Sequence, residues 1–129
     1  MQKSVVKLAL TGLVVLASLA CSSVMAKQMA QPSGDITIAV DQLPPQGRDT
    51  YQRIQQGGPF PFEKDGIVFG NRERMLPSAK RGYYHEYTVK SPGSQNRGTR
   101  RIVCGGAATT PDACYYTADH YASFRKIVP

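Results

Sequence analysis

The chain has 129 residues and a formal net charge of +7 at pH 7. This length excludes a large multidomain protein and suits one domain with a modest core. The positive charge favours a polyanionic partner, namely nucleic acid, an anionic surface or an acidic protein. Charge alone does not separate these partners, because many exported proteins are mildly basic.

Residues 1–26 have the pattern of a signal peptide. Lys3 and Lys7 give a positive start, an apolar core follows, and small residues typical of a cleavage site end the segment. The apolar run is short for a transmembrane helix. A lipoprotein anchor at Cys21 is the alternative, although Ser18 stands where such anchors usually carry an aliphatic residue. We therefore expect export and a secreted, extracellular protein.

Cleavage after residue 26 would leave 103 residues, a net charge of +5 and two cysteines. Cys104 and Cys114 lie in strand-like segments joined by glycines and a polar loop. In an oxidising compartment, a disulfide that pins this hairpin is favoured. A zinc site is the alternative, but the two cysteines and two histidines have no zinc-like spacing. We expect a structural disulfide, no metal and no cofactor.

The first part of the mature chain predicts a strand and a helix. Residues 27–34 have the composition of a flexible new N-terminus. Apolar residues alternate over 35–40, which predicts a short strand. Leu43-Pro44-Pro45 then starts a helix, because proline suits the first helical turn. Gly57-Gly58 is a strong signal for its end.

The remaining elements are strands separated by Gly- and Pro-rich turns. The segments with strand-like composition are 67–69, 83–89, 100–104, 113–117 and 122–128. One strand and one helix followed by a run of hairpins is typical of an α+β domain. We therefore expect one N-terminal helix packed on a twisted antiparallel sheet of about five strands.

The loop after the 67–69 segment has the residues of a base-binding site. Gly70 and Asn71 tolerate left-handed backbone angles, which predicts a sharply folded loop with outward-facing amides. Phe69 offers an aromatic face beside Asn71 and the carboxylate of Glu73. This combination can stack a base and hydrogen-bond its edge.

Glu86 differs from most other acids because it lies inside a strand. With a period of two, Glu86 shares a face with Tyr84 and Thr88, while His85 and Tyr87 face the other way. Two interpretations fit: a catalytic carboxylate, or a surface carboxylate paired with an arginine across the sheet. Turn or helix-capping roles suit four other acids. Asp49, Asp65 and Asp112 lie beside Thr, Gly or Pro, and Asp41 lies just before the Leu43-Pro44-Pro45 helix start.

Arginines and a histidine complete the chemistry. Arg97, Arg100 and Arg101 either form a solvated basic face or grip a phosphate, since guanidinium forks match phosphate oxygens. His120 lies in a polar connection, where it is either a surface residue or a general acid. His85 is expected to be a packed histidine.

In combination these motifs resemble the bacterial guanyl-specific ribonucleases of the barnase and ribonuclease Sa type, and most of all the ribonuclease Sa group. The resemblance runs from about residue 35 to residue 127. The motifs that carry it are LPP, GPFP, NRE, GYYHEYTV, RGTRRI, YYT and DHYA-F. It implies the microbial ribonuclease fold for a domain at 35–129.

The resemblance also implies roles for individual catalytic residues. Glu86 corresponds to the general base, and His120 corresponds to the general acid. Arg97 and Arg101 bind and stabilise the phosphate, and Tyr121 adds a phosphate contact.

For the base, the resemblance places Phe69 against the guanine ring. Backbone amides near Asn71 and Arg72 would meet the guanine oxygen, and Glu73 would accept from its N–H groups. Gly70 departs from the ribonuclease Sa pattern, which has a larger polar residue there, so the rigidity of this loop is in question.

The implied activity is a secreted endoribonuclease. It would cleave single-stranded RNA after guanosine through a 2′,3′-cyclic phosphate, with no metal, and then hydrolyse that product to a 3′-phosphate. The implied partners are single-stranded RNA and an acidic barstar-like inhibitor, and the mature form would be a monomer without membrane attachment. A non-catalytic basic module that binds nucleic acid, and a toxin-like effector with the same chemistry, are the alternatives.

Overall fold

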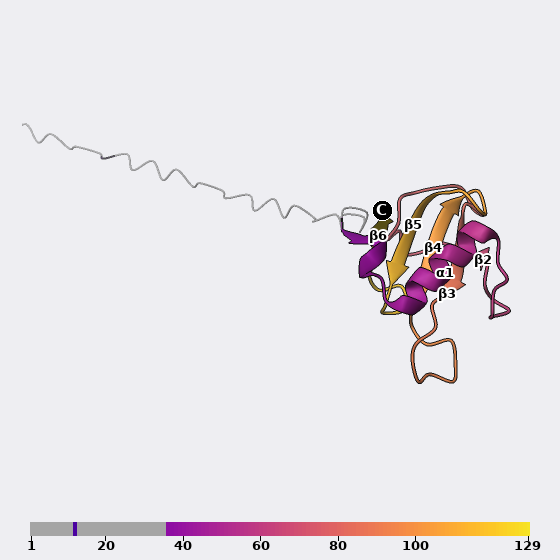
Figure 1. Ribbon diagram of the computed structural model, residues 1–129. Helices are drawn as coiled ribbons and strands as arrows, with labels where there is room; N and C mark the ends of the chain where they lie inside the picture. Colours follow the sequence, from indigo (N-terminus) through magenta and orange to yellow (C-terminus); the bar gives the residue numbers. More distant parts are fainter. Residues whose placement is uncertain (1–11, 13–35) are drawn as a thin grey trace, which may run out of the picture.

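The computed structural model describes residues 36–129 and the isolated Gly12. Apart from Gly12, the expected signal peptide lies outside the described residues, as do the expected flexible segment at 27–34 and Asp35. The elements in chain order are β1 (Thr37–Ala39), the 3-10 helix η2 (Val40–Gln42), α1 (Pro45–Gln56), β2 (Ile67–Val68), β3 (Tyr84–Thr88), β4 (Arg101–Gly106), β5 (Pro111–Thr117) and β6 (Arg125–Val128). Figure 1 shows α1 lying across the sheet.

Local signals fix both ends of α1. Pro45 occupies the first helical position, where its missing N–H costs no hydrogen bond. Gly57 ends the helix with a left-handed φ of 80°. Within the helix, the buried Thr50 donates its hydroxyl to the carbonyl of Thr88 at 3.1 Å. This bond ties the helix to β3, and the predicted helix is confirmed.

The sheet has the strand order β1-β6-β5-β4-β3-β2. Its pairs are antiparallel except for β1 and β6, which run parallel with Thr37 opposite Lys126. The α+β class with a helix on a sheet is confirmed, but the sheet has six strands and is mixed instead of wholly antiparallel. The sheet is mixed because the last strand, β6, runs alongside β1 in parallel. This pairing covers backbone groups of β6 that would otherwise form a sheet edge.

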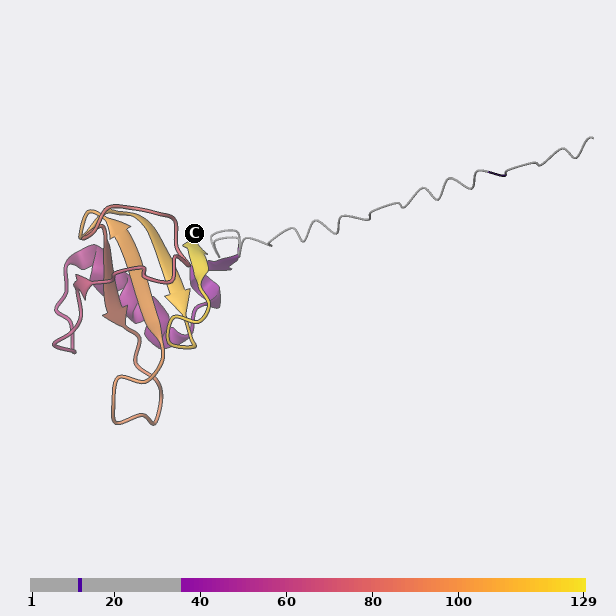
Figure 2. The same ribbon diagram turned by 180° about the vertical axis from the view of Figure 1, so that it is seen from behind.

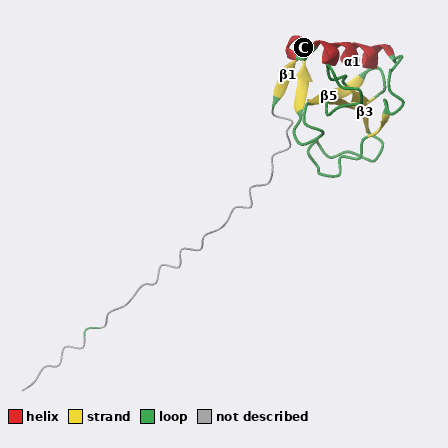
Figure 3. Ribbon diagram, turned by 90° about the horizontal axis from the view of Figure 1, so that it is seen from below, coloured by secondary structure: helices red, strands yellow, loops and turns green. Residues whose placement is uncertain are grey.

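The two faces of the sheet bury different clusters, and α1 covers only one of them (Figure 3). The helix-side core consists mainly of Ile38, Leu43, Ile54, Tyr87, Val89, Ile102, Tyr116 and Ile127. The core on the opposite face consists of Leu76, Tyr84, Val103, Tyr115 and Phe124. Because successive strand residues point to opposite faces, Tyr84 and Tyr87 fall in different clusters, as the alternation predicts.

Loops cover the sheet face opposite α1. Figure 2 shows the connection between β2 and β3 crossing this face. The connection between β3 and β4 extends beyond the end of the sheet in both views. Over residues 36–129, no helix has the length and apolar character needed to cross a membrane.

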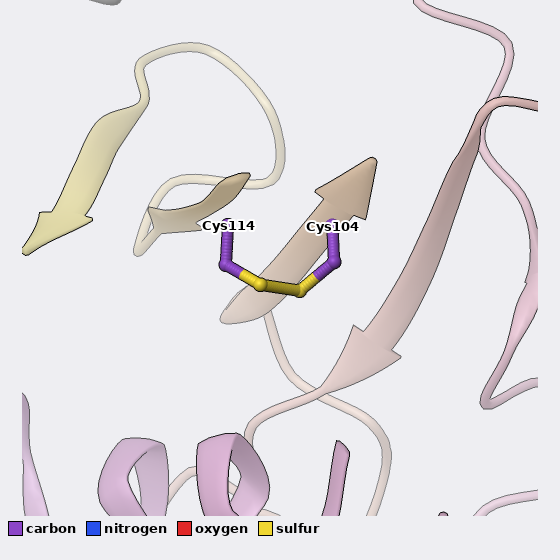
Figure 4. The surroundings of a disulfide bond; sticks show 2 residues. All are labelled: Cys104 and Cys114. Carbon is purple, nitrogen blue, oxygen red and sulfur yellow. A yellow bond between two sulfur atoms is a disulfide. The ribbon is translucent and has the colours of Figure 1, made fainter. Parts of the chain in front are cut away.

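The predicted disulfide is confirmed. Cys104 on β4 and Cys114 on β5 are direct partners in the strand register and are covalently joined (Figure 4). Both are buried within the helix-side core. The bridge therefore lies on the face that α1 covers, away from the opposite face with its loops.

Candidate active site

Glu86 lies in the middle of β3, between Ile67 on β2 and Val103 on β4. The residue is only 7% exposed, and both of its carboxylate oxygens are hydrogen-bonded. Arg97 donates from Nη2 to Oε1 at 3.2 Å, and Tyr121 donates its hydroxyl to Oε2 at 2.7 Å. Burying a carboxylate is costly unless such partners are present. Glu86 is therefore an oriented acceptor on the face opposite α1.

Arg97 contacts two residues on the same face of β3, Glu86 and Thr88. Its Nε donates to the hydroxyl of Thr88 at 2.9 Å, two positions along β3 from Glu86. Arg100 lies elsewhere, since its charge acts on Tyr116 in the helix-side core, where it opposes the burial that raises the pKa of that tyrosine. Of the predicted arginine run, Arg97 thus joins the carboxylate and Arg100 does not.

Arg101 is a buried cation that has no carboxylate within ion-pair distance among residues 36–129. It is 2% exposed, and its Nη1 donates to the backbone carbonyls of Arg97, Gly98 and Arg100 at 3.2, 3.0 and 2.8 Å. In the part of the chain that the structure describes, its Nε is the single buried side-chain polar atom without a partner. A buried guanidinium whose Nε has no partner, beside Arg97, favours an anionic ligand.

The connection between β5 and β6 holds His120 and Tyr121, both in left-handed conformations with φ of 53° and 72°. Asp119 stabilises this turn by accepting from the Ser123 hydroxyl at 2.6 Å and the Thr117 hydroxyl at 2.8 Å. This turn explains why the strand predicted over 122–128 begins only at Arg125.

His120 is an exposed residue beside the carboxylate site. Its amide donates to the carbonyl of Thr99 at 2.9 Å, which joins the turn to the β3–β4 connection. Its imidazole centroid lies 4.8 Å from that of Tyr121, whose hydroxyl binds Glu86. The structure thus brings His120 and Glu86 to the same region through Tyr121. His85, by contrast, is half-buried within β3 and points to the other face by strand alternation.

Tyr121 remains a hydrogen-bond donor at neutral pH. Burial, reinforced by its hydrogen bond to Glu86, raises the pKa of Tyr121 to about 12. Its ring stacks on Phe69 with centroids 5.2 Å apart, and Phe69 also meets the edge of Phe124 at 5.9 Å. The aromatic contacts fix the ring, so the hydroxyl is aimed at the carboxylate.

Asn71 closes the loop that follows Phe69. Its side chain donates to the carbonyl of Leu76 at 3.0 Å and accepts from the Leu76 amide at 3.1 Å, and its φ is 47°. The left-handed angle predicted for this loop is confirmed at Asn71 but is not adopted by Gly70. Gly70 is not required by this geometry, because a Cβ there would meet only the Arg72 side chain at an ordinary 3.5 Å.

A cleft of about 730 Å³ runs along this face, within the range of about 300–1,000 Å³ common for ligand sites. Its lining includes the predicted residues Phe69, Asn71, Arg72, Glu73, Glu86 and Tyr121. Arg97, Arg101 and His120 are not part of the lining and lie around Glu86 and Tyr121 instead. Apolar residues that the sequence did not single out, Met75 and Phe124, also line it.

Two cations in the cleft lining, Lys80 and Arg81, were likewise not predicted as site residues. Their adjacency in the sequence was a visible signal, and they directly precede the GYYHEYTV motif, but only the folded loop shows that they line the cleft. Between residues 36 and 129, no group of three or more His, Cys, Asp or Glu side chains is placed to hold a metal ion.

A helix on one face of the sheet, with a carboxylate, guanidinium groups and an imidazole on the other, defines a small microbial ribonuclease. A sequence profile of the ribonuclease family matches residues 26–128. The chain belongs to this family of enzymes, and the predicted relationship to the ribonuclease Sa type is confirmed.

Individual relatives agree with this assignment. The chain is 54% identical to guanyl-specific ribonuclease Sa of Kitasatospora aureofaciens over 91 residues, which cover 70% of this chain and 92% of that protein. It is 48% identical to guanyl-specific ribonuclease St of Saccharopolyspora erythraea over 101 residues, 75% of this chain and 96% of the relative. The match to guanyl-specific ribonuclease Sa3 of Kitasatospora aureofaciens has 56% identity over 85 residues, 66% of this chain, and spans only 58% of that protein.

Solved structures with the same fold include ribonuclease Sa2 in complexes with mononucleotides. That structure has a TM-score of 0.68 and 47% identity, and the match covers 73% of this chain and 94% of the other. Ribonuclease Sa2 with guanosine-2′-cyclophosphate has a TM-score of 0.66 and 46% identity, covering 73% of this chain and 96% of the other.

Proposed function

We propose that this protein is a secreted endoribonuclease that cleaves single-stranded RNA after guanosine. The observation that carries the proposal is the buried Glu86 carboxylate, which is held by Arg97 and Tyr121 and lines the same cleft as the Phe69–Glu73 loop. The names of ribonucleases Sa and St, which specify guanyl, and the guanosine-2′-cyclophosphate complex of ribonuclease Sa2 support it.

Guanine is the base that the loop suits. The ring of Phe69 supplies a stacking face, and the Asn71 side chain is occupied within the loop, which leaves backbone amides to donate to the guanine oxygen. Glu73, an exposed residue of the cleft lining, accepts from the guanine N–H groups. Adenine offers no carbonyl oxygen to those amides, so it fits this donor and acceptor pattern poorly.

The reaction begins when Glu86 takes the proton of the ribose 2′-hydroxyl. The 2′-oxygen attacks the adjacent phosphorus, and negative charge that gathers on the phosphoryl oxygens is stabilised by Arg97 and by the buried Arg101. The bond to the 5′-oxygen of the next nucleotide breaks as His120 protonates that oxygen. A 2′,3′-cyclic phosphate remains on the guanosine.

Hydrolysis reverses these roles. His120 takes a proton from water, the water attacks the cyclic phosphate, and Glu86 returns a proton to the 2′-oxygen, which gives a 3′-phosphate. Every step uses side chains of this chain and no metal ion. DNA lacks the 2′-hydroxyl nucleophile, so it would be bound without being cut.

A comparison of dinucleotide substrates tests the proposal. In the presence of a chelator, a guanylyl dinucleotide should be cut much faster than its adenylyl counterpart, with a cyclic phosphate appearing first. Equal rates for the two bases would contradict guanine specificity, and loss of activity with the chelator would contradict the metal-free mechanism.

Glu86→Ala and His120→Ala should each lower turnover by about 10²–10⁴-fold, the usual contribution of general acid–base groups. His85→Ala is the matched control, because His85 neighbours Glu86 in β3 but points to the other face. Circular dichroism should show all three variants folded. Wild-type turnover in either site variant would remove that residue from the mechanism.

Export is part of the proposal and rests on the N-terminal pattern of residues 1–26. The Cys104–Cys114 bridge supports it, because disulfides persist in oxidising compartments. N-terminal sequencing of protein collected from culture medium tests it, and a start near residue 27 is the expected result. Protein retained in the membrane with a lipid on Cys21 would instead indicate an anchor.

We also propose that the protein is a monomer and that an acidic protein inhibitor binds it. The net charge of +5 that remains after removal of residues 1–26 favours an acidic protein partner that covers the cationic face. Size-exclusion chromatography at several concentrations tests the monomer, and a concentration-dependent shift to a dimer would contradict it.

A further inference from the structure

Lys80 and Arg81 line the cleft and have no assigned role. Both residues are exposed. Within the described part of the chain, neither side chain makes a hydrogen bond, and neither lies within 4.0 Å of a carboxylate. Two adjacent cations without partners, in a cleft that binds a polyanion under the proposed function, are available for a further phosphate.

Hydrogen bonds hold the segment that carries Lys80 and Arg81 at two points, Pro77 and Lys80. The Tyr83 amide donates to the Lys80 carbonyl at 3.1 Å, and the Tyr84 hydroxyl donates to the Pro77 carbonyl at 2.6 Å. The Tyr83 hydroxyl also donates to Asp112 at 2.8 Å. Because the backbone is already ordered, binding an anion here would require ordering only the two side chains.

Strand register gives the order of groups along the cleft. Glu86 pairs with Ile67, whereas the Phe69 amide donates to the carbonyl of Tyr84 at 2.9 Å. Phe69 is thus level with Tyr84, about 7 Å along β3 from Glu86 at the usual rise per residue. Lys80 and Arg81 lie in the turn that leads into Tyr84. The two cations therefore line the cleft from the Tyr84 end of β3, where the stacking position is, and Glu86 lies two residues further along the strand.

The positions of Phe69, Glu86 and the two cations along the cleft indicate which phosphate of the RNA the cations would bind. Under the proposed function, the guanine stacks on Phe69 and the phosphate 3′ of the guanosine lies at Glu86. The phosphate on the other side of the same nucleotide is the 5′ one. We propose that Lys80 and Arg81 form a subsite for the phosphate 5′ of the cleaved guanosine, so that the enzyme favours guanosines preceded by another nucleotide. This inference rests on the proposed function.

The test compares a guanylyl dinucleotide with and without a 5′-phosphate. For the wild type, the 5′-phosphate should raise kcat/KM about threefold to tenfold, as expected for two exposed ion pairs. It should also steepen the dependence of log kcat/KM on log salt concentration by about 0.7. Lys80→Ser/Arg81→Ser should abolish both effects while leaving the rate on the unphosphorylated dinucleotide close to that of wild type.

Lys64→Ser/Lys90→Ser is the matched control, because it removes the same charge from two exposed lysines outside the cleft lining. This variant should keep the full 5′-phosphate effect. The absence of an effect in the wild type, or an equal loss in the control, would overturn the subsite. If the cleft cations instead proved necessary only for binding an acidic protein, they would form a protein-docking surface and the subsite would again be overturned.

The outcomes separate this inference from the proposed function. Guanine-selective cleavage that is indifferent to the 5′-phosphate contradicts the subsite alone. If neither dinucleotide is cut, the proposed function fails, and calorimetry of guanosine and guanosine 5′-monophosphate still tests the subsite. Tighter binding of the monophosphate by wild type, lost in Lys80→Ser/Arg81→Ser, is then the expected result, and equal binding contradicts it.

Discussion

At the scale of single residues, the buried charged groups of the site differ in how fully they are hydrogen-bonded. Glu86 is buried but has both oxygens hydrogen-bonded, whereas Arg101 is buried with its Nε unpaired. A paired carboxylate is stable without a ligand, while a buried guanidinium with a free N–H favours one. The protein is therefore preorganised for an anion next to an oriented proton acceptor.

Tyr121 has a contact that the family resemblance did not imply. The resemblance gave it a phosphate contact, and in this structure its hydroxyl donates to Glu86. Since its pKa is raised to about 12 by burial and by Glu86, the hydroxyl keeps its proton across the working pH range. It can therefore donate either to the carboxylate or to a bound phosphate.

Glu73 provides a residue-scale test of base recognition. Glu73→Gln replaces one of the two carboxylate oxygens with an amide that donates, so it loses part of the pattern that guanine requires. We expect the preference for guanylyl over adenylyl dinucleotides to fall about tenfold to a hundredfold, the range for one bidentate contact. Glu63→Gln, an exposed acid outside the cleft, should leave selectivity unchanged. Unchanged selectivity in Glu73→Gln would exclude this residue from recognition.

At the scale of elements, short loops carry most of the site and need their own stabilisation. The Asn71 side chain makes a reciprocal pair of hydrogen bonds with the Leu76 backbone, and Asn71 also adopts a positive φ. Each feature constrains the loop separately, since one depends on the side chain and the other on the backbone.

Two substitutions separate these features. Asn71→Ala loses the side-chain bonds and strains the backbone, so the free energy of unfolding should fall by about 1–3 kcal/mol. Asn71→Gly loses the same bonds but tolerates the positive φ, so it should be less destabilised. Urea denaturation measures both, and KM for guanylyl substrates should rise in each. Equal stability of Asn71→Ala and wild type would contradict this role.

The turn that carries His120 depends on Asp119. Hydrogen bonds from the Ser123 hydroxyl, and then from Thr117, lower the pKa of Asp119 below its ordinary value, despite some desolvation. A depressed pKa in the folded state means that the ionised carboxylate stabilises the protein. That contribution is complete above the unfolded pKa of about 3.9 and is lost as the pH falls through the folded pKa.

Asp119→Asn should therefore be less stable than wild type at pH 7, and the difference should shrink as the pH falls below about 4. Urea unfolding of both proteins between pH 7 and pH 3 measures this. A difference that stays constant over the whole range would show that Asp119 contributes through geometry and not through its charge.

At the scale of the whole molecule, the sheet separates stability from chemistry. One face buries α1 and the disulfide, and the opposite face carries the cleft. Substitutions in the helix-side core should therefore change stability more than selectivity. The exposed strand β2, with Ile67 and Val68 about half accessible, lies at the edge of the sheet beside the cleft.

The disulfide tests this separation. Closing a ring of 10 residues should stabilise the fold by about 2–3 kcal/mol in the chain-entropy model, so Cys104→Ala/Cys114→Ala should unfold at a lower urea concentration. Under conditions where it still folds, guanine preference should be unchanged. Wild-type protein treated with reductant controls for the smaller side chains. A variant as stable as the oxidised wild type would contradict the prediction.

The sequence predicted those features whose causes are local. Pro45 and Gly57 mark the ends of α1 because their backbone preferences act within one turn. The alternation around Glu86 followed from the strand period, and Cys104 was paired with Cys114 because the two lie in one hairpin. The β1–β6 pairing was missed, since Thr37 and Lys126 are brought together only by the assembled sheet.

By itself, then, the sequence determined the helix, the face on which Glu86 lies, the disulfide and, through family resemblance, the residues expected to react. Only the tertiary structure decided that Tyr121, 35 positions from Glu86, donates to it, and that Lys80 and Arg81 line the cleft. It also decided that the Nε of the buried Arg101 has no partner within the described part of the chain. The physical reason is range: backbone preferences act between neighbours, whereas these contacts depend on the register of strands that meet only in the folded sheet.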